Sequence, residues 1–183
     1  MSTRFIARLT ALTLLATCSP IALADDDKKD AKLNDSVMQR LQGRWEVVGG
    51  VNQGRELSEA ELKGTYNTVA TNTITTYDRN EHQRFRAVFS IDSAEDPIQI
   101  NMTSVPQKST VAKRDLKVPT EDIVAAGILK FEGVDKWTLC YALPGNDRPT
   151  KFESPEGSKV MLFHLVRRQG DPVPDGRSAS KTK

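Results

Sequence analysis

The stretch that decides the fold is residues 41–48, LQGRWEVV, in which a Gly-x-Trp element opens the first strongly strand-forming segment of the chain. Trp45 and Val47 alternate with Arg44 and Glu46, and this period of two indicates a strand with one buried face. From here to about residue 168 the chain consists of short strand-like segments separated by turn residues. The sequence therefore predicts an all-β domain over residues 36–168.

The clearest of the later strands has apolar residues at every second position, with polar residues between them. The apolar positions are Phe85, Ala87, Phe89 and Ile91, and the pattern repeats at Ile98, Ile100 and Met102. Five more strands are expected at residues 65–70, 73–77, 125–131, 136–143 and 160–166. Together these segments make about eight antiparallel strands, a number that closes into a barrel. A two-sheet sandwich is the alternative.

The residues before this domain predict export from the cytoplasm. Arg4 and Arg8 precede an apolar run at residues 9–17, and Ala22-Leu23-Ala24 resembles a signal-peptide cleavage site. The apolar run is too short to span a bilayer. We therefore interpret residues 1–24 as a signal peptide and expect a periplasmic or extracellular protein without a membrane span.

Cys18 leaves a lipoprotein open as the alternative. Residues 15–18, LATC, resemble the site at which bacterial lipoproteins are cleaved and lipidated on cysteine. Thr17 departs from that pattern, in which a smaller residue usually precedes the cysteine. A lipid anchor at Cys18 would leave the folded domain unchanged.

Charge and cysteine content limit the possible partners of the mature chain. Cleavage after Ala24 would leave 159 of the 183 residues, enough for one hydrophobic core. It removes two basic and no acidic side chains from totals of 26 and 24, so the mature chain is formally neutral. This balance argues against a nucleic-acid partner. Only Cys140 would remain, which leaves no internal disulfide, and we expect a monomer stabilised by its core.

Four further segments complete the predicted organisation. Residues 25–35 are Asp-, Lys- and Ala-rich and are interpreted as a charged, flexible linker. Asp35 or Ser36 then caps a short helix that lies across one end of the strands. Residues 106–120 form the longest loop and are a candidate for binding, and residues 169–183 are interpreted as a disordered tail.

The order of several short motifs carries a family resemblance. The motifs are Leu41-x-Gly43-x-Trp45, Gly127-Ile128-Leu129, Trp137-Thr138-Leu139-Cys140-Tyr141, Arg148-Pro149-Thr150-x-Phe152, Gly157 and Leu165-x-Arg167. In this order and spacing the chain resembles the uncharacterised lipocalin-like domain family abundant in exported proteins of planctomycete bacteria. The resemblance implies a lipocalin-like barrel and, only by analogy, a binding role. The chain departs from true lipocalins because it lacks their disulfides and their full middle motif.

The same resemblance implies structural roles for Gly43, Trp45 and Arg167. Trp45 would pack at the closed end of the barrel under Arg167 as a cation–π pair, and Gly43 would let the leading helix cross closely over the strand. Arg148 beside Pro149 has two interpretations. It either hydrogen-bonds neighbouring carbonyls and fixes a turn, or it recognises an anion at the barrel mouth.

The sequence offers little support for catalysis. His82 and His164 stand far apart without nearby metal ligands at the usual spacing, and no phosphate loop, Gly-x-Ser-x-Gly or Cys-x-x-Cys motif occurs. Cys140 is interpreted as a small buried residue of the outer barrel wall, reactive only if a His or Lys lies beside it. We therefore expect neither an enzyme nor a bound cofactor or metal.

Two functions remain as hypotheses. The first is that the barrel binds a small apolar or amphipathic molecule through its inward-facing residues. These candidate ligand-binding residues are Phe85, Ala87, Phe89, Ile98, Ile100, Leu129 and Tyr141. The alternative is an extracytoplasmic protein- or polysaccharide-interaction module with a packed, ligand-free barrel. It would use residues 106–120 or the face that carries Arg79, Arg84 and Arg86.

Overall fold

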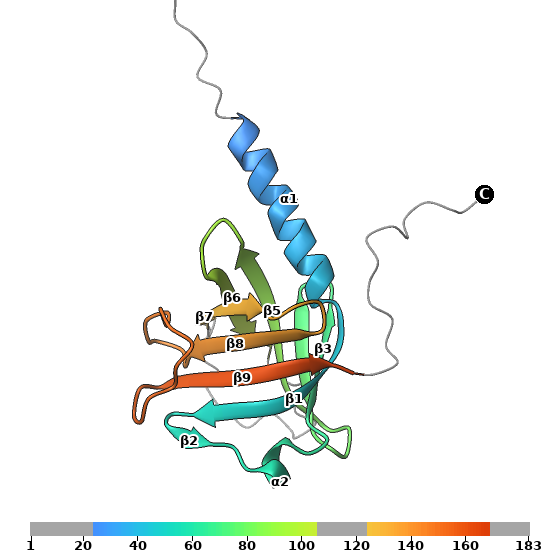
Figure 1. The fold of residues 1–183 in the computed structure, drawn as a ribbon, viewed down its shortest axis with the longest axis vertical. Helices are drawn as coiled ribbons and strands as arrows, with labels where there is room; N and C mark the ends of the chain where they lie inside the picture. The colour runs from blue at the N-terminus through green and yellow to red at the C-terminus, as the bar shows by residue number, and fades with distance from the viewer. Residues whose placement is uncertain (1–23, 106–123, 169–183) are drawn as a thin grey trace, which may run out of the picture.

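The computed structural model describes residues 24–105 and 124–168 (Figure 1). Within those ranges the chain forms two helices and nine strands. The elements are α1 Ala24–Leu41, β1 Gly43–Asn52, β2 Arg55–Glu56, α2 Glu59–Leu62, β3 Tyr66–Ala70, β4 Thr73–Tyr77, β5 Gln83–Asp92, β6 Ile98–Ser104, β7 Val124–Phe131, β8 Lys136–Ala142 and β9 Val160–Arg167. The predicted signal peptide up to residue 23, the predicted loop and the predicted tail lie outside the described residues.

The strands close into an eight-stranded antiparallel barrel. Each strand from β3 to β8 pairs with the next along the chain, and β1 pairs with both β3 and β9, which closes the ring. The two-residue strand β2 only adds a short ribbon to β1. The predicted all-β barrel is therefore confirmed, and the sandwich alternative is wrong because no sheet edge separates β9 from β1.

The alternation read from the sequence sets which side chains fill the barrel. In the ladder from β5 to β8, Phe89 lies opposite Met102, Ile98 opposite Leu129, and Leu129 opposite Leu139. Successive residues of a strand point to opposite faces, so these side chains all point inward. Leu129 is fully buried and Met102 and Leu139 are nearly so, which places the main core inside the barrel.

Two tryptophans fill one end of this core. Trp45 of β1 is fully buried and Trp137 of β8 nearly so, and their rings meet edge to face with centroids 5.9 Å apart. Aromatic rings prefer this geometry because the positive ring edge faces the negative ring face of the partner. The half of the barrel that holds Trp45 is therefore densely filled.

Helix α1 differs from the prediction. Residues 24–34, expected to belong mainly to a flexible linker, are helical, and Asp35 and Ser36 lie inside the helix rather than at its start. The segment contains no Gly or Pro, and Val37 and Leu41 pack into the barrel core. Once packing fixes these last turns, each further residue adds a backbone hydrogen bond at little cost, so the helix continues toward the N-terminus. Figure 1 shows its first turns projecting away from the barrel.

A second, smaller cluster lies on the outer wall. Cys140 is fully buried there with Ile128 and Leu162, and Phe152 and Val160 pack against them. The Cys140 thiol lies 3.5 Å from the carbonyl oxygen of Lys151, so the chain between β8 and β9 covers this wall. The predicted position of Cys140 on the outer wall is confirmed.

Candidate functional site

One end of the barrel is closed by Arg167. Its guanidinium carbon lies 4.0 Å from the centroid of the Trp45 ring, within the range of a cation–π interaction. The same guanidinium donates hydrogen bonds to the carbonyl oxygens of Gln42 at 2.9 Å and Arg40 at 3.0 Å. The indole N–H of Trp45 donates to the carbonyl oxygen of Leu41 at 2.7 Å. The last carbonyls of a helix lack partners within the helix, so these bonds fix the end of α1 over the barrel.

Gly43 connects the helix to this closure. Its φ of 112° lies in a region that favours glycine, and a Cβ there would lie 2.8 Å from a terminal guanidinium nitrogen of Arg167. Glycine is therefore required by the backbone turn and by the guanidinium beneath it. The resemblance implied this pairing of Trp45 with Arg167, but it explained Gly43 only through the crossing of the helix.

Arg148 lies outside the lumen and ties distant strands together. It donates to the carbonyl oxygens of Ile100 at 2.9 Å and Gly127 at 2.5 Å, and to the Asn101 side-chain oxygen at 2.8 Å. These acceptors belong to β6 and β7, not to the turn beside Pro149 as the sequence suggested. Since both terminal nitrogens donate to protein acceptors, the contacts favour the structural interpretation of Arg148 over anion recognition.

The other half of the barrel contains a cavity of about 220 Å³. Tyr141, which borders the cavity, lies four residues along β8 from Trp137, roughly 13 Å away. The cavity therefore begins beside the tryptophan pair, where Asn67 lies opposite Trp45, and extends toward Tyr141. Its lining residues are Val47, Thr65, Asn67, Ile74, Thr76, Phe85, Met102, Leu139, Tyr141 and Phe163. None of these side chains carries a charge at neutral pH.

The structure divides the seven predicted ligand-binding residues into two groups. Phe85 and Tyr141 line the cavity, and the Tyr141 ring stacks on Phe163 with centroids 6.1 Å apart. The remaining five point inward but pack in or against the core and do not border the cavity. These are Ala87, Phe89, Ile98, Ile100 and Leu129. The alternation of these residues predicted that they point into the barrel, but it did not predict which of them border the cavity.

Sequence reasoning missed the polar part of the cavity. Asn67 is only 7% exposed, and its side-chain oxygen has no hydrogen-bond partner among the described residues. Thr76 adds a hydroxyl group to the lining, whereas the hydroxyl of Thr65 donates to the carbonyl oxygen of Glu61 at 3.1 Å. The Tyr141 hydroxyl donates to the Met161 sulfur at 3.4 Å, and burial raises the pKa of Tyr141 to about 12. One signal in the sequence could have revealed it. Asn67 stands two residues before Val69 in a predicted strand, so its side chain shares the inner face with an apolar residue.

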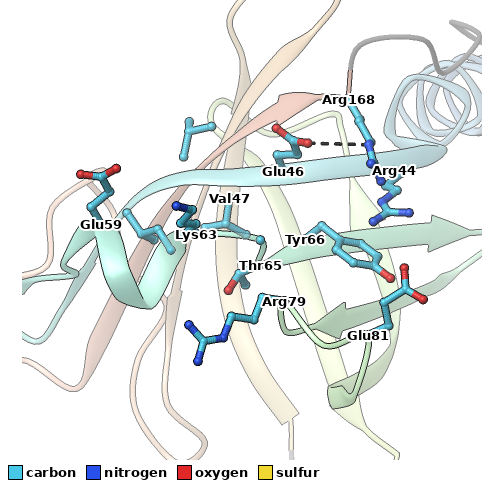
Figure 2. A pocket seen from close by; sticks show the side chains of 13 residues that line it. Arg44, Glu46, Val47, Glu59, Lys63, Thr65, Tyr66, Arg79, Glu81 and Arg168 are labelled. Carbon is cyan, nitrogen blue, oxygen red and sulfur yellow. Dashed lines mark ion pairs between the residues drawn. The ribbon is translucent and has the colours of Figure 1, made fainter.

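A second hollow of about 660 Å³ lies on the outer wall between β1, α2 and β3, and is called here the outer groove (Figure 2). Its lining residues are Arg44, Glu46, Val47, Val48, Glu59, Leu62, Lys63, Gly64, Thr65, Tyr66, Arg79, Glu81 and Arg168. The Arg44 guanidinium carbon lies 3.5 Å from the centroid of the Tyr66 ring. The Nε of Arg168 lies 3.8 Å from a carboxylate oxygen of Glu46. The groove is thus polar, with charges of both signs.

Of the three arginines of the predicted basic face, one borders the outer groove. Arg79 lines the outer groove, whereas Arg84 forms an ion pair with Asp78 at 2.6 Å, and neither Arg84 nor Arg86 borders the groove. Arg86 is exposed on β5. The charge of Arg84 is compensated by Asp78, so of the three residues Arg79 is the one placed in a hollow.

The described residues show little reactive chemistry. In residues 24–105 and 124–168 no group of three or more His, Cys, Asp or Glu side chains is arranged to hold a metal ion. Burial raises the pKa of the Cys140 thiol to about 11, so the thiol stays protonated and weakly nucleophilic at neutral pH. Neither helix in the described part of the chain has an apolar stretch long enough to cross a membrane.

The fold and the cavity define a small closed antiparallel β-barrel, sealed by Arg167 and Trp45 and hollow beyond the tryptophan pair. Comparisons with protein-family models, with curated proteins and with solved structures found no match.

Proposed function

We propose that this chain is an exported, monomeric lipocalin-like protein that binds a small apolar or amphipathic molecule in the hollow half of its barrel. The carrying observation is the uncharged cavity of about 220 Å³ inside an otherwise packed barrel. Ligand sites are typically concave and largely apolar with a few polar groups, and this cavity fits that description. The resemblance to the planctomycete lipocalin-like family supports the same assignment by analogy.

The size of the cavity restricts the ligand. Sites for drug-sized ligands occupy about 300–1,000 Å³, so a cavity of about 220 Å³ is too small for haem or a retinoid. A dry apolar cavity of about 150 Å³ is enough to bind benzene in another protein. We therefore propose ligands with about one aromatic ring, or a short alkyl chain.

A thermal-shift titration tests this proposal. Toluene, phenol and indole are the probes, with haem and retinol for comparison. A ligand at 100 times its Kd stabilises the folded state by about 2.7 kcal/mol, which raises the Tm of a chain of this size by roughly 5–11 °C. We expect at least one single-ring probe to produce such a shift, and haem and retinol to produce none.

A pair of matched variants locates the binding. Thr76 lines the cavity, and Thr68 on the neighbouring strand points to the outer face of the barrel. Thr76→Phe should fill the cavity and abolish the probe-induced shift, whereas Thr68→Phe should leave it unchanged. Equal shifts in both variants would place the probes outside the barrel and contradict the proposal.

The outer groove supports a second candidate function, the binding of an acidic polysaccharide. This candidate is supported by two arginines in the groove lining: Arg44, whose guanidinium lies over the Tyr66 ring, and the exposed Arg79. Guanidinium groups pair with the carboxylates that such a polymer carries. In calorimetry with oligogalacturonate, Arg79→Gln should weaken binding, while Arg86→Gln, which lies outside the groove, should not. Absence of heat from the unmodified protein rules this candidate out.

Export is also a proposal, and intact-mass analysis of the protein from its native envelope tests it. A mature chain that begins at Asp25 would support cleavage after Ala24. A lipidated N-terminal Cys18 would support the lipoprotein alternative, and an uncleaved chain would contradict both. Size-exclusion chromatography with light scattering tests the proposed monomer.

A further inference from the structure

Asn67 gives the lumen cavity a chemical preference that its shape alone does not provide. Asn67 lies opposite Trp45 in the β1–β3 ladder and opposite Thr76 in the β3–β4 ladder. Side chains directly opposite each other in an antiparallel pair are neighbours. The amide therefore borders the cavity on the side of the sealing tryptophan.

The buried side-chain amide of Asn67 has an unpaired acceptor among the described residues. It is 93% buried, and its oxygen has no hydrogen-bond partner in the described part of the chain. An unpaired buried acceptor is destabilising, because it has lost water without gaining a partner. Asn67 also lines the cavity, and because the last side-chain torsion of asparagine is soft, a rotation of the amide presents this acceptor to a hydrogen-bond donor in the cavity.

The rest of the lining decides the charge of the ligand. The cavity lining contains no cationic or anionic side chain. Its other polar side chains are Thr76, Tyr141, whose hydroxyl donates to the Met161 sulfur, and Thr65, whose hydroxyl donates to the carbonyl oxygen of Glu61. A carboxylate or an ammonium group would lose its hydration there without a counter-ion, which is strongly unfavourable. A neutral hydroxyl avoids that cost, and since it donates and accepts, it can pair with either edge of the amide.

We infer that the lumen is selective for single-ring or short-chain neutral alcohols and phenols, which enter hydroxyl-first and donate a hydrogen bond to Asn67. The inference rests on the proposed lumen function and names its ligand class. The volume fits, because about 220 Å³ exceeds the roughly 150 Å³ cavity that holds a benzene ring in another protein. The hydroxyl replaces the missing partner of the amide, and the ring or alkyl chain contacts Phe85, Tyr141 and Phe163.

The test compares phenol, toluene and benzoate, which share a ring and differ in the polar group, by calorimetry on the full folded chain. We expect phenol to bind about tenfold more tightly than toluene, the difference associated with one net hydrogen bond, and benzoate not to bind. Asn67→Leu should remove the preference by weakening phenol about tenfold while leaving toluene unchanged or improved. Asn80→Leu, an exposed position outside the cavity, should change neither affinity.

A second measurement does not depend on how the variant folds. In the unmodified protein, the side-chain amide NMR signals of Asn67 should shift with phenol and not with toluene. If toluene binds as tightly as phenol, or if the Asn67 signals do not respond, the inference is overturned while the lumen function stands. If no probe binds in the lumen, the proposed function is overturned and the inference with it.

Discussion

Replacing Arg167 with methionine should release α1 from the barrel and strongly destabilise the protein. Arg167 is 7% exposed, and its guanidinium lies on the Trp45 ring while donating to the carbonyl oxygens of Arg40 and Gln42. Methionine fills a similar length but carries no donor, so the cation–π contact and both helix-end hydrogen bonds are lost together. The two carbonyls would then be left partly buried without these partners.

The contacts set the size of the effect. A hydrogen bond to a charged group contributes about 1.5–3 kcal/mol, and a desolvated cation–π contact about 2 kcal/mol. Part of this loss of stability is offset, because a buried methionine carries no charge and so avoids the desolvation penalty of a buried cation. We therefore expect a loss of about 4 kcal/mol, a large fraction of the 5–15 kcal/mol typical of a folded domain. For a chain of this size the Tm should fall by roughly 8–16 °C.

Urea unfolding followed by tryptophan fluorescence measures this loss, and hydrogen exchange reports on the helix. The amides of α1 should lose protection before those of the strands, since the last turn of α1 is held by the substituted side chain. Arg168→Met is the matched control, because Arg168 is exposed and makes only a 3.8 Å ion pair with Glu46, which contributes about 0–1 kcal/mol. Equal losses in the two variants would refute the structural role assigned to Arg167.

Three further predictions concern other parts of the barrel. Gly127→Ala should lower stability by about 1–3 kcal/mol in urea unfolding, because the new Cβ would lie 2.8 Å from the carbonyl oxygen of Cys140; an unchanged midpoint would contradict this close packing. Cys140 should resist iodoacetamide at pH 8 in the folded protein and react in guanidinium, as mapped by peptide mass spectrometry; rapid labelling of the native protein would show that the thiol is accessible. The Arg55 hydrogen bond lowers the pKa of Glu61 from 4.5 to about 2, so its contribution is present above pH 4.5 and is lost as the pH falls toward 2. The stability advantage over Glu61→Gln should accordingly narrow across that range, and a difference independent of pH would contradict the pairing.

The sequence by itself determined the fold class and the position of most strands. A period of two in apolar residues requires one buried face, and short turns between successive segments favour antiparallel neighbours, so the segment around Phe89 and the hairpin of β7 and β8 could be predicted. The resemblance implied the pair of Trp45 and Arg167, which the structure places 4.0 Å apart. The length of α1 could not be predicted, because residues 24–34 have no apolar period of their own and extend a helix that tertiary contacts stabilise at its other end.

Only the tertiary structure decided where the barrel is filled and where it is hollow. Alternation assigns Ile100, Leu129 and Tyr141 to the same inner face, but the volume left between opposite walls depends on side chains that meet across the barrel. The tryptophans fill one half, and the cavity remains in the other. The unpaired oxygen of Asn67 was likewise not predictable from the sequence, because whether a buried amide finds a hydrogen-bond partner depends on the strands that surround it in the folded barrel.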